Sequence, residues 1–150
     1  MHTITRPNDF LNEIVIVRGH PGSGKTVFAK AFEAHGYKHF ENDSFFVGAD
    51  GVYKFDFAHH QTAKDHCIKQ AIQALDGFEN VVVSNTFTTL AEMEPLISFA
   101  KEMGFIFRVF EMENDFDNVH DVPAAVVADK KAKFERFETA VQIKGDYKVI

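Results

Sequence analysis

One eight-residue segment constrains the fold of this chain more than any other. Residues 19–26 read GHPGSGKT, which fits the pattern G-x-x-x-x-G-K-[ST] at every fixed position. A continuous apolar run at 14–17 precedes the segment, and apolar residues at helical spacing follow it from Val27. A short apolar run that ends at a glycine is typical of a buried parallel strand. The sequence therefore predicts a strand, a glycine-rich turn and a helix in immediate succession.

The same segment predicts a binding site for a polyphosphate. Its glycines let the backbone curve around phosphate oxygens, and the amides of the turn and of the following helix point at the anion. Lys25 is expected to reach the β- and γ-phosphates, and the Thr26 hydroxyl to ligate Mg²⁺. The alternative is a glycine-rich turn that binds nothing, which the strand–turn–helix context disfavours. We predict that ATP or GTP, with Mg²⁺, is held by His20, Pro21, Gly22, Ser23, Gly24, Lys25 and Thr26.

Strand and helix patterns alternate along the rest of the chain. Strands are expected within 11–17, at 37–40, 81–83 and 105–110, and within 142–150. Helices are expected from Val27 to a stop at Gly36, over 57–75 before Gly77, from Thr89 to Gly104, and from Pro123 with Val127, Phe134 and Phe137 on one side. This alternation predicts an α/β fold, a three-layer P-loop NTPase sandwich with a mostly parallel sheet of four or five strands flanked by helices.

Pro95 leaves two alternatives for the third helix, and the composition of the chain sets the bounds of a loop and of the domain. Pro95 lies inside the apolar stripe of the third helix, so that helix either bends there or begins its regular part near Glu94. Residues 111–121 are polar and acidic and are expected to form a loop. With no repeat or linker, residues 1–150 are expected to form one domain, with 1–10 as a lead-in arm.

Charge and composition limit the partners of the chain. Its 150 residues are 45% hydrophobic and carry a net charge of −6, so we expect any nucleic-acid contact to be short, such as one strand end. No apolar run approaches the length of a membrane span. Cys67 is the single cysteine and is expected in the core, which fits a reducing, cytoplasmic location. An oligomer is possible, but no sequence feature supports one.

With these motifs in view, the chain resembles the polynucleotide-kinase-like branch of P-loop kinases. This AAA-type ATPase-like family includes the kinase domain of phage 5′-polynucleotide kinase. The resemblance implies transfer of the γ-phosphoryl of ATP to a hydroxyl, often a nucleic-acid 5′-hydroxyl, with Lys25 and Asp43 as catalytic residues. The matching segments are RGHPGSGKT (18–26), ENDSFF (41–46), VYKFDF (52–57), VVVSNT (81–86), EMEPLISFAKEMGF (92–105) and NVHDVP (118–123).

The resemblance places Asp43 as the general base. A carboxylate at the carboxyl end of a strand beside the phosphate loop lies where open α/β sheets bind ligands. There it can accept a proton or hold a magnesium-bound water. The alternative is that Asp43 caps the helix or turn that follows the second strand.

Four further residues are candidates for nucleotide or substrate contacts. Asn85 and Thr86 end the third strand pattern and either contact substrate or form a polar strand end. Lys54, flanked by aromatic residues, either binds an acceptor phosphate or belongs to a cluster that anchors the loop. His120 either contacts adenine or hydrogen-bonds within the lid segment.

The sequence departs from the family in two places. Relatives usually carry an Asp in the segment that ends the third strand, where this chain has Ser84, Asn85 and Thr86. Relatives also carry arginine in the lid that closes over ATP, whereas the short lid-like segment 111–123 has acidic residues and no arginine. Three functions remain open: a kinase acting on a nucleic-acid 5′-end or a nucleotide-like acceptor, a nucleotide-binding switch or interaction module, and a small-molecule phosphotransferase.

Overall fold

A parallel five-stranded sheet forms the centre of the protein. The computed structural model describes residues 12–116 and 122–145, in which the strand order is β2-β3-β1-β4-β5 and every pairing is parallel. This arrangement confirms the predicted α/β class and parallel sheet. The strands are β1 (Glu13–Arg18), β2 (Lys38–Phe40), β3 (Val81–Asn85), β4 (Ile106–Met112) and β5 (Val141–Ile143).

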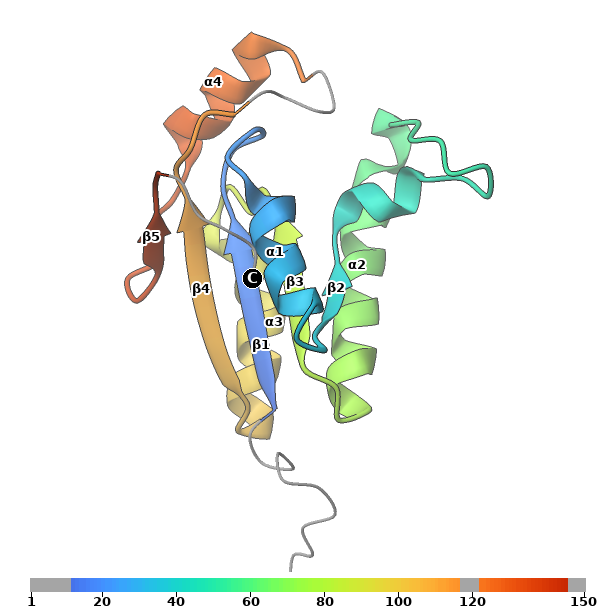
Figure 1. Ribbon diagram of the computed structural model, residues 1–150, viewed down its shortest axis with the longest axis vertical. Helices are drawn as coiled ribbons and strands as arrows, with labels where there is room; N and C mark the ends of the chain where they lie inside the picture. Colours follow the sequence, from blue (N-terminus) through green and yellow to red (C-terminus); the bar gives the residue numbers. More distant parts are fainter. Residues whose placement is uncertain (1–11, 117–121, 146–150) are drawn as a thin grey trace, which may run out of the picture.

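Helices cover both faces of the sheet (Figure 1). Ile14 and Ile16 of β1 face a core shared with α2 and α3, whereas Val15 and Val17 face the core under α1. Both faces of β1 are therefore buried, which explains its unbroken apolar sequence. Helix α4 lies beyond the carboxyl ends of the strands (Figure 1). The helices are α1 (Lys25–Glu33), α2 (His60–Asp76), α3 (Leu90–Met103) and α4 (Ala124–Lys133), with 3₁₀ turns η1 (Asn42–Phe46) and η2 (Phe57–His59).

The predicted helix ends are mostly confirmed, with one correction at Pro95. Gly77 and Gly104 follow the last residues of α2 and α3, and Gly104 adopts the left-handed conformation (φ 74°) that favours glycine at a helix end. Thr89 precedes α3, as predicted. A regular helix that begins near Glu94 is wrong, because α3 begins at Leu90 and runs through Pro95.

The carboxyl-terminal third corrects two predictions. Helix α4 ends at Lys133, so Phe134 and Phe137 do not share a helix face with Val127. The backbone turns extended at Phe134 because tertiary contacts replace helical ones: the Glu135 amide donates to the Thr88 carbonyl at 2.9 Å. The predicted loop at 111–121 also begins later, since β4 extends through Met112 and buries Glu111.

A buried ion pair joins β1 to β4 at the edge of the sheet next to the phosphate loop. Arg18 and Glu111 are paired in register on the two strands, and neither residue is exposed to solvent. Arg18 Nη1 lies 2.6 Å from Glu111 Oε2, while Arg18 Nε donates to the Phe87 carbonyl at 3.0 Å. Burial lowers the pKa of Arg18, and the charge of Glu111 opposes that effect.

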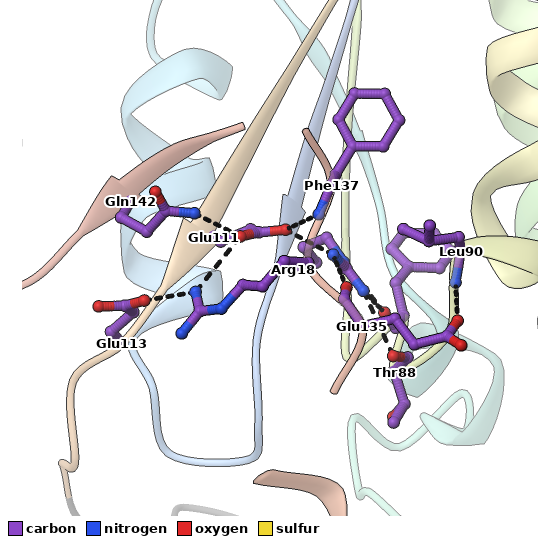
Figure 2. Close-up of polar contacts among 10 residues, drawn as sticks. Arg18, Thr88, Leu90, Glu111, Glu113, Glu135, Phe137 and Gln142 are labelled. Atoms are coloured by element: carbon purple, nitrogen blue, oxygen red, sulfur yellow. Dashed lines mark hydrogen bonds and ion pairs between the residues drawn. The ribbon is translucent and has the colours of Figure 1, made fainter. Parts of the chain in front are cut away.

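Glu111 gathers further donors from the segment that follows α4 (Figure 2). Its carboxylate accepts hydrogen bonds from the Phe137 amide at 2.8 Å, from Gln142 Nε2 at 2.5 Å and from Arg136 Nη1 at 3.3 Å. The pair and its partners therefore tie β1, the β3–α3 connection, β4 and residues 135–142 together. Because Gly19 directly follows Arg18, this network fixes the start of the phosphate loop.

No helix within residues 12–116 and 122–145 is both long and apolar enough to cross a bilayer. Cys67 lies in the core, 2% exposed, as predicted. Burial raises the pKa of its thiol to about 11, so the side chain behaves as a small apolar residue rather than as a nucleophile.

Neutralising Glu111 is expected to destabilise the fold strongly. The Glu111→Gln substitution leaves the buried Arg18 guanidinium without a counter-charge, which typically costs about 3–5 kcal/mol. Urea denaturation of the variant against wild type measures this loss. Asp129→Asn is the matched control, because Asp129 pairs with Lys133 on the exposed surface of α4 and should cost about 0.5 kcal/mol or less. Equal losses in both variants would contradict a structural role for the buried pair.

Candidate nucleotide-binding site

The segment 19–26 forms a tight loop between β1 and α1. Gly22 and Gly24 adopt positive φ values of 82° and 98°, which other residues rarely adopt. A Cβ atom at Gly22 would also lie 2.8 Å from the Phe116 carbonyl oxygen. The Gly19 amide donates to the Thr86 carbonyl at 3.2 Å, so the backbone of Thr86 anchors the loop to the end of β3. Helix α1 begins at Lys25, so its amino terminus faces the loop.

Lys25 lies partly buried with its amine directed into the loop. Its Nζ donates to the His20 carbonyl at 3.0 Å. Burial lowers the pKa of Lys25 to about 8, and the nearby carboxylates of Asp43 and Glu41 oppose the shift. A lysine whose charge is poorly hydrated and only partly compensated is well suited to bind a phosphate anion.

The Thr26 hydroxyl contacts a carboxylate, Glu41, that is not among the predicted site residues. Thr26 Oγ1 donates to Glu41 Oε2 at 3.1 Å, and Glu41 directly follows β2. The predicted magnesium ligand therefore lies beside Glu41. Two signals in the sequence were available: Glu41 lies at the carboxyl end of a predicted strand, and it is the first residue of the ENDSFF segment.

Asp43 lies in η1, two residues beyond Glu41, and is oriented by neighbouring groups. The Tyr53 hydroxyl donates to Asp43 Oδ1 at 3.2 Å. The Asn42 amide donates to Asn85 Oδ1 at 2.6 Å, while Asn85 Nδ2 reaches Cys67 Sγ at 3.4 Å. Asn85 is 6% exposed, so it positions the Asp43 segment against β3 through its side chain.

A second segment lies against the phosphate loop from the carboxyl end of β4. The Phe116 amide donates to the Gly22 carbonyl at 2.7 Å, and Asp115 Oδ1 lies 3.0 Å from His20 Nε2. Asp115 also forms an ion pair with Lys131 of α4. Burial and the charge of Lys131 lower the pKa of His20, which favours the neutral imidazole in this contact.

One predicted site residue, Lys54, lies apart from this arrangement. Lys54 lines an open hollow of about 540 Å³ together with Phe45, Phe46 and residues 47–50 and 52, and no residue of loop 19–26 lines it. His120 lies outside the described residues, as does the rest of 117–121 within the lid-like segment 111–123.

Comparison with known proteins supports the interpretation of the loop. A family described as an AAA domain matches residues 14–121. The chain belongs to this AAA domain family. An uncharacterised protein of Pasteurella multocida is 32% identical over 132 residues, covering 78% of this chain and 73% of that protein.

Several solved structures share the fold of this chain. Kti12 from Chaetomium thermophilum, solved with ADP-AlF₃, is 12% identical with a TM-score of 0.65 and covers 89% of both chains. A candidate kinase from Chloroflexus aurantiacus is 20% identical with a TM-score of 0.54, over 67% of this chain and 59% of its own. The Pnkp1/Rnl/Hen1 complex contains a match of 20% identity and TM-score 0.57, over 86% of this chain and 44% of that chain. This AAA domain chain therefore spans less than two thirds of the length of the last two.

Nucleotide binding is expected to be coupled to proton uptake by Lys25. Phosphate oxygens stabilise the charged amine, so binding raises the pKa of Lys25 from its value of about 8. The affinity for MgATP should therefore fall as the pH rises from about 7 to about 9, with up to one proton taken up on binding near pH 8. Titration calorimetry in buffers of different ionisation enthalpy measures this uptake. Lys25→Met should abolish it, and a wild-type affinity that does not change with pH would contradict the assignment.

Removing the charge of Asp115 is expected to strengthen nucleotide binding. This carboxylate holds His20 and Lys131 beside a site for anions, so Asp115→Asn should tighten MgATP binding about two- to fivefold. Asp129→Asn removes the same charge from a pair with Lys133 and is the matched control. An equal gain in both variants would show a general effect of net charge and contradict a local role for Asp115.

Proposed function

We propose that this chain is an ATP-dependent phosphotransferase that moves the γ-phosphoryl to a hydroxyl acceptor. The observation that carries the proposal is the convergence of Lys25 and Thr26, beyond β1, with two carboxylates, Glu41 and Asp43, beyond β2. Phosphoryl transfer needs cations on the phosphates and a carboxylate that orients the attacking hydroxyl. A protein that only binds nucleotide has no need of a carboxylate that orients an acceptor hydroxyl.

Each residue has a distinct role in this proposal. The loop amides and Lys25 hold the β- and γ-phosphates, and the Thr26 hydroxyl is a ligand for Mg²⁺, which would neutralise charge on the phosphates when bound. Asp43 accepts the proton of the acceptor hydroxyl. The hydrogen bond from Tyr53 keeps the Asp43 carboxylate oriented, and burial together with Asp43 raises the pKa of Tyr53 to about 12, so the phenol remains a donor.

For the acceptor we propose the 5′-hydroxyl of a short nucleic-acid end or a nucleotide-like molecule. Support comes from the resemblance to polynucleotide kinases in the sequence and from the structural similarity to a chain of the Pnkp1/Rnl/Hen1 complex. The net charge of −6 disfavours long polyanions. The hollow lined by Phe45, Phe46 and Lys54, next to η1, offers aromatic faces and a cation to such an acceptor.

A nucleotide-binding switch or interaction module is the second candidate. The observation that favours it is that each arginine within residues 12–116 and 122–145 is engaged by glutamate: Arg18 by Glu111, Arg108 by Glu13, and Arg136 by Glu111 and Glu113. Transition-state charge on the transferred phosphoryl is commonly stabilised by arginine. This candidate retains nucleotide binding and predicts no turnover.

Transfer of labelled γ-phosphate separates these two functions. With ATP, Mg²⁺ and a 5′-hydroxyl dinucleotide, wild type should give a labelled product, and a 5′-phosphorylated dinucleotide should give none. Asp43→Asn should lower the rate by about 10²–10⁴-fold, because the general base is lost, while MgATP binding changes little. Asp76→Asn, at the exposed carboxyl-terminal end of α2, is the matched control and should retain the rate. Nucleotide binding without transfer to any hydroxyl acceptor would favour the switch module.

A further inference from the structure

The end of β3 lacks the carboxylate that a magnesium site of this kind requires. In P-loop NTPases, Mg²⁺ is held by the Ser or Thr of the phosphate loop together with an acidic residue from a neighbouring strand. Strand β3 pairs directly with β1, but it ends in Ser84 and Asn85 and continues to Thr86. None of these three side chains carries a charge, so an acidic partner must come from another element.

A glutamate that directly follows β2 supplies a carboxylate at this position. Glu41 Oε2 accepts one hydrogen bond from Thr26 Oγ1 at 3.1 Å and another from Ser84 Oγ, also at 3.1 Å. The same oxygen therefore bridges the phosphate loop and the end of β3. Strand β3 lies between β2 and β1 in the sheet. A carboxylate that follows β2 must therefore reach past the end of β3 to the phosphate loop, and the side chain of glutamate is long enough to do so.

The neighbours of Glu41 hold it in place. His39, on β2, lies with Nε2 at 2.6 Å from Ser84 Oγ and at 3.7 Å from Glu41 Oε2. The other ring nitrogen, Nδ1, lies 3.2 Å from Glu33 Oε2 at the end of α1. The imidazole side chain is about one-tenth exposed, so it is a fixed support and not a surface group. Partners of this kind orient metal ligands in proteins.

We propose that Glu41, directly after β2, is the acidic partner of Mg²⁺ in this site and replaces the carboxylate that β3 lacks. The inference rests on the proposed nucleotide site. Hydroxyl and carboxylate oxygens are the hard donors that Mg²⁺ prefers. Because Thr26 donates its proton to Glu41, the lone pairs of the hydroxyl oxygen are available to a cation.

With Glu41 as the acidic ligand, the metal needs no third protein group, and Asp43 keeps a single role. Among the described residues no set of three His, Cys, Asp or Glu side chains is placed to hold a metal ion. Mg²⁺ bound with nucleotide phosphates keeps several waters and uses one or two protein groups, so Thr26 and Glu41 are sufficient. Asp43, which the sequence offered for both metal binding and base catalysis, then serves as the base.

The magnesium dependence of binding of a non-hydrolysable ATP analogue, AMPPNP, tests the assignment. Calorimetric titrations with Mg²⁺ and with EDTA give the gain in affinity that the metal provides. Glu41→Gln should reduce this gain about 10–100-fold and leave the affinity in EDTA unchanged or slightly higher. Glu33→Gln is the matched control, because Glu33 contacts the other ring nitrogen of His39. This variant should retain the gain in affinity that Mg²⁺ provides. Circular dichroism and thermal melting establish that each variant is folded.

A rescue experiment separates metal binding from a merely structural role. Ser84→Asp introduced into Glu41→Gln places a carboxylate on β3 itself and should restore most of the magnesium-dependent gain. The proposal is overturned if Glu41→Gln keeps the full gain, if Asp43→Asn loses it instead, or if wild type shows no gain. AMPPNP transfers no phosphoryl group, so these results do not depend on turnover. A protein with the expected gain and no transfer to any acceptor would disprove only the phosphotransferase function.

Discussion

The ion pair between Arg18 and Glu111 is the interaction on which the geometry of the site depends. Both side chains are fully buried, in register on β1 and β4, at the point where the sheet gives way to the phosphate loop. Burying two charges is costly, and the cost is offset only when every remaining donor and acceptor finds a partner. Here the partners come from the β3–α3 connection and from residues 135–142, so the pair orders segments that are far apart in the sequence.

The nucleotide site is assembled from the ends of neighbouring strands. The phosphate loop follows β1, Glu41 and η1 follow β2, Ser84 and Asn85 end β3, and residues 113–116 follow β4. Parallel strands bring all their carboxyl ends to one edge, which is where open α/β sheets bind ligands. The departures from the polynucleotide-kinase-like pattern therefore need not abolish the chemistry, because a group lost from one strand can be supplied by the next, as we propose for Glu41 beside Ser84.

The sequence predicted the parts of the fold that are set by local patterns. Residues 14–17 and 81–83 are apolar on both faces and gave their strands, and Gly77 and Gly104 marked helix ends. The end of α4 was wrong because contacts of Phe134, Glu135 and Phe137 with Arg18, Thr88 and Glu111 override their helical spacing. Glu111 looked like the start of an acidic loop, since its buried partner lies 93 residues away. Lys25, Thr26 and Asp43 came from a motif and a resemblance, whereas the contacts of Glu41 with Thr26 and Ser84 depend on which strands are neighbours.

The most direct test of the whole account is a crystal structure of the protein with Mg²⁺ and AMPPNP. We expect the β- and γ-phosphates on the amides of residues 19–26 and on Lys25, with the metal bound to Thr26 Oγ1 and with Glu41 bound to the metal or to one of its waters. The carboxylate of Asp43 should face the γ-phosphate across a space that an acceptor hydroxyl can enter. Nucleotide bound elsewhere, or a metal held without Thr26 and Glu41, would contradict the account.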